Sequence, residues 1–177
     1  VIASGLTVTC ERDQVIDFSL PYWEVDQAVL VREDSDLNAI TAFNGTKVGA
    51  QAGTTGYQWI EDNLVAQGID VKLRAYETYE MAVRDLENGR IAAVLCDTDT
   101  AQGFVDAGRK VKIVGIVRTG EQYAYAVTAG DPYGLLPKIN DGLRKLYESG
   151  VWAELVAKYF PGRPVGPVPL KRTTVCE

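Results

Sequence analysis

Residues 4–12 of this chain read SGLTVTCER, and residues 15–23 read VIDFSLPYW. The pattern predicts a strand end that opens into a loop of small and hydroxyl residues, with one arginine close by. Gly5 lets a ligand approach the backbone, Thr7 offers a hydroxyl, and Arg12 carries a planar guanidinium that matches a carboxylate. The loop is therefore a candidate site for the head group of an amino acid. A strand, a turn and a solvated arginine are the alternative, because arginine is mostly a surface residue.

Composition limits the classes of function. The chain has 177 residues, of which 46% are hydrophobic, so it can bury a core as one domain or two small lobes. Its net charge is −6 with no basic stripe, which argues against nucleic-acid binding. The sequence contains no histidine, which removes Ser-His-Asp and Cys-His catalysis and the commonest metal ligand. No apolar run approaches the length of a membrane span.

The three cysteines, Cys10, Cys96 and Cys176, are an odd number, and their spacing matches no metal site. Cys96 follows the apolar run 91–95 and is expected to be a small buried hydrophobe. A disulfide between Cys10 and Cys176 is conceivable, but their separation in sequence gives it little support. The chain begins within an expected strand and without methionine, so we expect a fragment or a processed product.

A second informative stretch covers residues 47–60, KVGAQAGTTGYQWI. It predicts a buried strand, a glycine-rich turn and a helix, with backbone N–H groups at the turn that favour an anion such as a carboxylate. Gly53, Thr54 and Thr55 are the candidate binding residues. Thr55 and Gln58 also have capping-box spacing, so the alternative is that a threonine only caps the helix. No Gly-Lys-Ser/Thr ending supports a phosphate loop.

Strands and helices alternate through the middle of the chain. We expect a strand at 71–76, a helix at 78–88, and an apolar strand at 91–95 buried on both faces. The helix can place Met81, Ala82, Val83 and Leu86 on one inner face. This order predicts a mostly parallel sheet with helices on both sides. Asp97 stands at the carboxyl end of the apolar strand, where such sheets bind ligands, and can pair with an ammonium group. Asp97 or Asp99 can equally cap the next helix, which runs to about residue 107.

The remaining elements follow from apolar periodicity and turn residues. We expect strands at 25–32, 111–117 and 122–128, helices at 37–43, 135–148 and 151–160, and an extended tail from residue 163.

The first stretch resembles the signature of the family 3 extracellular solute-binding proteins, the amino-acid receptors of ABC importers. The Asp-Phe-Ser-x-Pro-Tyr run, the 53–55 turn and the aspartate at 97 occur in the order typical of that family, and the resemblance extends to Gly162. It implies an α/β fold of the periplasmic-binding-protein-like type 2, with two lobes of mostly parallel sheets joined by two hinge strands. Most members have proline where this chain has Cys10.

The resemblance also assigns roles to the candidate residues. Arg12 and the Gly53-Thr54-Thr55 turn would hold the ligand carboxylate, while Asp97 and the Gly5/Thr7 loop would hold its ammonium group. It favours Asp97 over a capping role, with Asp99 in the first turn of the following helix. Side-chain specificity is left open, since both a neutral polar and a charged amino acid are compatible.

The implied domain organisation is a second lobe at 33–121, hinge strands at 25–32 and 122–128, and a partial first lobe made of 1–24 and 129–177. The first lobe lacks its N-terminal part. Such a lobe exposes strand edges and apolar surface, so we expect a partner chain that supplies the missing part, domain swapping or self-association, or weakened binding.

The sequence thus predicts a receptor that captures a free amino acid for ABC-type import, without catalytic residues, cofactor or metal. Its expected partner is a membrane permease, and its expected location is periplasmic or extracellular, free or anchored to the membrane through an absent N-terminus. Two alternatives stay open. One is the sensing ectodomain of a receptor or kinase, and the other is an enzyme similar to cyclohexadienyl dehydratase, for which Glu11, Asp97 and Asp99 are the available carboxylates.

Overall fold

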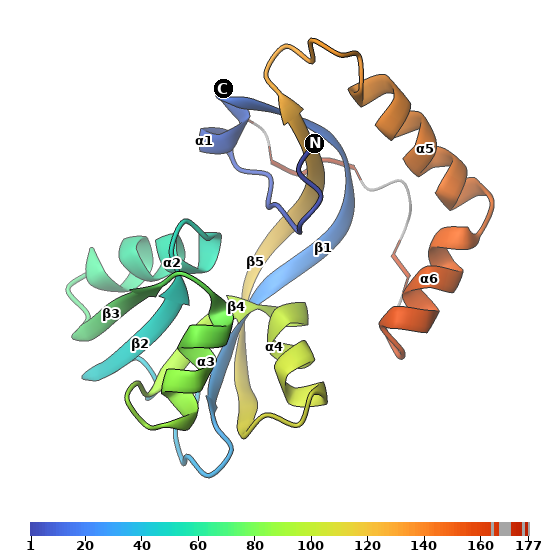
Figure 1. Cartoon of the computed structure of the whole chain (residues 1–177). Coiled ribbons are helices and arrows are strands. Elements are labelled where there is room, and N and C mark those ends of the chain that lie inside the picture. The colour runs from blue at the N-terminus through green and yellow to red at the C-terminus, as the bar shows by residue number, and fades with distance from the viewer. Residues whose placement is uncertain (164, 167–170, 175, 177) are drawn as a thin grey trace. The chain divides into compact units, whose positions relative to one another are not determined.

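The computed structural model describes residues 1–163, 165–166, 171–174 and 176 (Figure 1). The chain divides into two compact units. Unit 1 comprises Val1–Glu24 and Gly120–Glu177, and unit 2 comprises Val25–Thr119. Two long strands, β1 (Ile16–Arg32) and β5 (Val111–Thr128), contribute residues to both units. Among the described residues, no helix is long and apolar enough to cross a membrane.

The described strands form one five-stranded sheet in the order β3-β2-β4-β1-β5. Strand β2 (Thr46–Gln51) pairs in parallel with β3 (Val71–Tyr76) and with β4 (Ala93–Asp97). Strand β1 runs antiparallel to β4, and this register places Gln27 opposite Asp97. The parallel strands β2 and β4 therefore end at the same edge of the sheet, where residues 53–55 follow β2 and Asp97 is the last residue of β4.

Helices cover both faces of the sheet in unit 2. Helices α3 (Tyr79–Glu87) and α4 (Thr98–Asp106) pack on the face formed by Ala28, Leu30, Val94 and Cys96. Helix α2 (Thr55–Ile60) and the π-helix η1 (Glu61–Val65) pack on the face formed by Val29, Val31, Ala93 and Leu95 (Figure 1). The prediction that the apolar run is buried on both faces is confirmed, because successive residues of a strand point to opposite sides.

Gly56 determines how closely α2 approaches the sheet. A Cβ atom at this position would lie 2.7 Å from the Gln27 Oε1 atom and 3.4 Å from the Leu95 carbonyl oxygen. Any side chain here would displace α2 or Gln27. The glycine therefore brings the start of α2 next to Gln27.

Unit 1 contains α1 (Cys10–Asp13), α5 (Leu136–Glu148) and α6 (Val151–Tyr159). The carboxylate of Asp131 accepts hydrogen bonds from the backbone N–H groups of Leu135 and Leu136 at 2.8 and 2.9 Å, and so caps the start of α5. Aromatic rings hold the helices to the strands. Tyr22 stacks on Tyr125 with ring centroids 4.6 Å apart, and Trp152 of α6 packs edge-on against Tyr22. Trp152 and the buried Val156 are thus part of the packing of α6, whereas Tyr159 is 63% exposed.

Two expectations about regular structure are wrong. Residues 37–43 do not form a helix. The turn made by the Ala42 N–H and the Asn38 carbonyl oxygen tightens at Phe43, whose N–H donates to the Ile40 carbonyl oxygen, and it ends at Gly45, which has a φ of +69°. The strands expected at 111–117 and 122–128 are one continuous strand, β5. The backbone N–H of Thr119, where a turn was expected, donates instead to Asp26 Oδ1 at 2.9 Å.

The start of the chain also differs from expectation. The first stretch is a loop with isolated pairings to β5 at Ile2 and Thr7, followed by the short helix α1. The tail was expected to be extended from residue 163. Residues 164, 167–170, 175 and 177 lie outside the described part of the chain. The described tail residues from 171 onward form neither helix nor strand.

Candidate functional site

In unit 1, Thr7 and Arg12 are joined by a direct contact. The Arg12 Nη1 atom donates to the Thr7 carbonyl oxygen at 2.9 Å, and the Arg12 backbone N–H donates to the Thr9 hydroxyl at 3.2 Å. Thr9 is the N-cap of α1, so the start of the helix and the guanidinium are held by the same loop. The Thr7 hydroxyl donates to Glu121 Oε2 at 3.1 Å, and Thr7 is buried.

Gly5 is required by the backbone of this loop. Its φ of +66° lies in the left-handed region, and an added Cβ atom would lie 3.2 Å from the Tyr123 ring. The loop after it lies along β5, because the Val8 N–H donates to the Gln122 carbonyl oxygen at 2.9 Å and the Ala124 N–H donates to the Leu6 carbonyl oxygen at 3.1 Å. The structure therefore places Gly5, Thr7 and Arg12 in one loop that is supported by β5.

In unit 2, the glycine-rich turn connects β2 to α2 as predicted. Gly53 has a φ of +73°. Thr54 is the N-cap of α2, and its hydroxyl accepts from the Tyr57 N–H at 3.3 Å and donates to the Gln51 carbonyl oxygen at 2.7 Å. The expectation that a threonine of this turn caps the helix is confirmed at Thr54, whereas Thr55 does not take the capping position. Thr55 is the first residue of the helix instead.

Asp97 is the last residue of β4 and stands at the N-cap position of α4, yet its side chain makes no capping hydrogen bond. The Asp97 Oδ1 atom accepts from Gln27 Nε2 at 2.6 Å. The same Gln27 nitrogen lies 3.4 Å from the Thr55 hydroxyl oxygen. Gln27 therefore joins two candidate residues that come from different elements, and Asp99 occupies the first turn of α4.

Sequence reasoning missed Gln27. It is fully buried, at the centre of β1 and opposite Asp97 in the register. A buried amide must be hydrogen-bonded, so a glutamine flanked by the apolar residues of strand 25–32 was an available signal. Each unit thus brings together its own candidate residues: Gly5, Thr7 and Arg12 in unit 1, and Gly53, Thr54, Thr55 and Asp97 in unit 2.

Burial shifts the pKa values of two side chains next to these residues. Burial, followed by the proximity of Tyr125, raises the pKa of Tyr22, while a backbone hydrogen bond with Gly5 opposes the shift. Burial and the adjacent Asp97 carboxylate raise the pKa of the Cys96 thiol, which is therefore neutral and unreactive at neutral pH.

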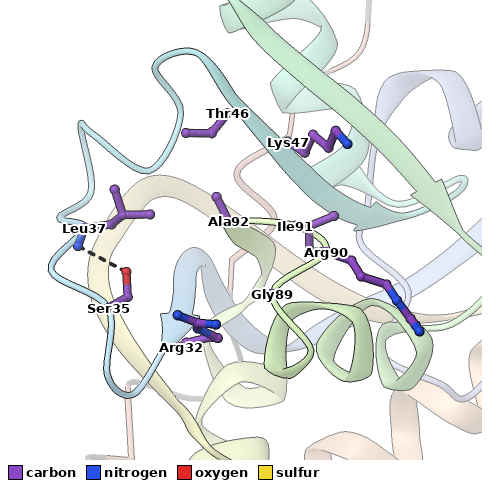
Figure 2. A pocket seen from close by; sticks show the side chains of 9 residues that line it. All are labelled: Arg32, Ser35, Leu37, Thr46, Lys47, Gly89, Arg90, Ile91 and Ala92. Atoms are coloured by element: carbon purple, nitrogen blue, oxygen red, sulfur yellow. Dashed lines mark hydrogen bonds between the residues drawn. The ribbon is translucent and has the colours of Figure 1, made fainter.

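A cavity of about 450 Å³ lies at the opposite edge of the sheet, near the beginning of β2 and the residues that precede β4 (Figure 2). None of the candidate residues lines it. Two of its cations already pair with carboxylates, Arg32 with Asp34 at 3.0 Å and Arg90 with Asp85 at 2.7 Å. Within the described residues, no cluster of three or more carboxylate or cysteine side chains is arranged to hold a metal ion.

Comparison with known proteins identifies the family. The model of the bacterial extracellular solute-binding proteins, family 3, matches residues 1–162. This chain belongs to that family. The resemblance inferred from the first stretch is confirmed, and so is the fold class that it implied.

The chain is similar to several amino-acid-binding proteins of ABC transporters. It is 28% identical to the ABC transporter arginine-binding protein 1 of Escherichia coli over 165 residues, which are 90% of this chain and 65% of that protein. It is 31% identical to a probable histidine-binding protein of Neisseria gonorrhoeae, with 90% of this chain and 60% of that protein covered. Both matches show that the chain spans less than two thirds of these relatives' length.

A solved structure supports the same assignment. An ancestral arginine-binding protein bound to arginine matches the solute-binding protein with a TM-score of 0.80 and 35% identity, covering 88% of this chain and 69% of that one. The relatives are named as binding proteins and not as enzymes.

Proposed function

We propose that this protein binds a free α-amino acid for an ABC-type importer. The observation that carries the proposal is the Asp97 carboxylate, which stands at a helix start without capping it and is held by the buried Gln27. A carboxylate fixed in this way can pair with the ammonium group of a ligand. The names of the relatives support an amino acid as the ligand.

Both charges of an amino acid have a counterpart in the chain. Arg12 and the backbone N–H groups of the Gly53-Thr54-Thr55 turn would bind the carboxylate, because a guanidinium and a helix start both favour an anion. Asp97 and the loop with Gly5 and Thr7 would bind the ammonium group. The proposal therefore requires residues of both units to bind one ligand.

The same proposal gives a role to the strands between the units and to each lobe. Residues 25–32 and 122–128 act as hinge strands between a second lobe at 33–121 and a first lobe made of 1–24 and 129–177, and the lobes close on the ligand. The chain works outside the cytoplasm with a membrane permease as its partner. The disulfide between Cys10 and Cys176 supports an oxidising compartment.

We further propose that binding proceeds without chemical transformation, as the names of the relatives suggest. The first lobe would be completed by a partner segment or by a second copy of the chain. Apolar side chains on α6 support this, since Leu155 is 38% exposed and Tyr159 is 63% exposed.

Thermal unfolding in the presence of each of the twenty amino acids tests the function. A ligand present at about 100 times its Kd adds about 2.7 kcal/mol to the free energy of unfolding and raises the Tm by roughly 5 to 10 °C for a chain of this size. We expect one amino acid or one chemical class to produce this shift.

Substitutions identify the residues responsible. Arg12→Ala and Asp97→Ala should each weaken binding by about 30-fold or more, because removing one partner of a desolvated charge pair costs about 2 kcal/mol or more. Asp99→Ala and Arg32→Ala are the matched controls and should bind as the unchanged protein does. The proposal would be refuted if Asp97→Ala kept its affinity, or if no amino acid raised the Tm of the unchanged chain.

A further inference from the structure

The end of the chain lies against the loop that carries Arg12. We call residues 171–174 and 176 the C-terminal strap. Cys176 forms a disulfide with Cys10, with Cα atoms 5.3 Å apart. The Arg172 Nη2 atom pairs with Asp13 Oδ2 at 2.8 Å, and the Thr174 hydroxyl donates to the Val8 carbonyl oxygen at 3.4 Å. The strap therefore contacts the loop before α1 and both ends of α1.

Gln122 of β5 connects the strap to the same loop. Its side-chain Nε2 atom donates to the Lys171 carbonyl oxygen at 2.9 Å, and its Oε1 atom accepts from the Thr173 backbone N–H at 2.9 Å. This pair of bonds reproduces the pairing that a neighbouring strand would make. Its backbone carbonyl meanwhile accepts from the Val8 N–H at 2.9 Å. Gln122 is 1% exposed, so its amide depends on these partners.

Helix α1 needs such support, because it has only four residues and a helix of that length is not stable by itself. Cys10 is its first residue after the N-cap Thr9, the position where proline is favoured because its fixed φ already suits a helix. The disulfide restrains this position through the side chain. Asp13, the last residue of α1, is restrained by Arg172. Arg12 lies between the two restrained residues.

We propose that the C-terminal strap positions Arg12 for ligand binding, so that affinity depends on the Cys10–Cys176 disulfide. The inference rests on the function proposed above. A loop that is ordered before binding does not lose that freedom when the ligand arrives, so the strap raises affinity without touching the ligand. A dithiol reductant reverses this effect. It transfers two electrons and two protons to the sulfur atoms, which gives two cysteine thiols and one oxidised, cyclic reductant.

The test compares three forms of the chain by amide hydrogen exchange of residues 8–13 and by thermal shift with the twenty amino acids. In Cys10→Ser/Cys176→Ser we expect exchange at least tenfold faster and affinity at least tenfold weaker. In Cys10→Pro/Cys176→Ser, proline restrains the helix start without the strap, and affinity should return to within about threefold of the disulfide-bonded chain. If the disulfide only stabilised the fold, proline at position 10 would not restore affinity.

Two controls separate the possible outcomes. Lys171→Ala should change nothing, because only the backbone of Lys171 is used. Treatment of the unchanged protein with dithiothreitol should reproduce the Cys10→Ser/Cys176→Ser result without a substitution. Equal affinity with and without the disulfide, or no rescue by Cys10→Pro/Cys176→Ser, overturns the proposal. If no amino acid shifts the unchanged protein, the proposed function fails and the affinity claim fails with it, while the exchange rates still decide whether the strap orders α1.

Discussion

Two buried glutamines perform related tasks at the level of single residues. Gln27 holds Asp97 and lies beside Thr55, and Gln122 holds the loop and the strap. An amide in an apolar environment is costly unless its partners are placed correctly, so each glutamine favours one arrangement of its neighbours. The position of Asp97 at the end of a strand was predictable from the apolar run before it. Gln27 was not predicted, because glutamine is mostly a surface residue and its partner is 70 residues away in the chain.

The role of Gln27 can be separated from simple packing by two substitutions. Gln27→Leu removes the donor to Asp97 and should weaken binding at least about tenfold at every pH, a cost near that of one hydrogen bond to a charged group. Gln27→Glu introduces a carboxyl beside Asp97, and burial together with the like charge raises the pKa of the introduced group. As pH falls from 8 to 5, that group becomes protonated and can donate to Asp97 as the amide did. Affinity in Gln27→Glu should therefore recover at low pH.

Calorimetric titration over this pH range provides the measurement. The matched control is Gln58→Glu, since Gln58 of α2 donates to Asp62 of η1 at 2.9 Å in an exposed pair. Its affinity should follow the same pH profile as the unchanged chain. If the affinity of Gln27→Glu varied with pH in parallel with that of Gln27→Leu, the hydrogen bond to Asp97 would have no role in ligand binding.

At the scale of elements, helix α3 combines an apolar face with one buried carboxylate. Its period predicted the burial of Ala82, Val83 and Leu86, but Met81 is 39% exposed and was assigned wrongly. Asp85 is buried on the inner face instead. It accepts from the Tyr76 hydroxyl at 3.0 Å and pairs with Arg90 at 2.7 Å. Periodicity could not predict this, because a charged residue in an apolar position is tolerated only when tertiary partners are present.

The Asp85 contacts make stability depend on pH. Hydrogen bonding from Arg90 is the largest cause that lowers the pKa of Asp85, and burial raises the pKa of Tyr76 to about 12. Because the folded-state pKa of Asp85 is lowered, its stabilisation is present above the ordinary carboxyl range and is lost as pH falls through the lowered value. Asp85→Asn should reduce the free energy of unfolding at pH 7 by about 1 to 3 kcal/mol. The difference from the unchanged chain should shrink below about pH 4.

Urea unfolding at pH 7, 5 and 3 measures this difference. Asp141→Asn is the matched control, because Asp141 forms an exposed ion pair with Lys145 one helical turn away. Its effect should stay below about 0.5 kcal/mol at each pH. A difference between Asp85→Asn and the unchanged chain that stays constant from pH 7 to 3 would contradict the assignment.

For the whole molecule, the alternation of strands and helices predicted the sheet of unit 2, because each short apolar strand needs helices on both faces. The covalent link between Cys10 and Cys176 was considered from the sequence but not favoured. Their separation of 166 residues gives no local signal, and the pairing depends on how β5 holds the tail. Both cysteines belong to unit 1, while the buried Cys96 belongs to unit 2.

Reduction of the disulfide should therefore destabilise unit 1 more than unit 2. Breaking a disulfide of this kind costs about 2 to 5 kcal/mol. With dithiothreitol we expect faster hydrogen exchange at the Ala124 and Ala126 amides, which bond to residues 6 and 2, and a smaller change in the core of unit 2. Iodoacetamide should label two cysteines in the reduced, folded chain and leave Cys96 unmodified. This expectation would be contradicted if reduction accelerated hydrogen exchange equally in both units, or if Cys96 were labelled.

The disulfide also has a topological consequence. Because it joins residues 10 and 176, almost the entire backbone lies within one closed covalent ring. A protease that cuts once inside the ring, for example in the exposed turn at Glu33 and Asp34, releases no fragment. The cut opens the ring and leaves two polypeptides that remain connected through the disulfide. A single cleavage would thus be visible only after reduction, when the two pieces migrate separately on a gel.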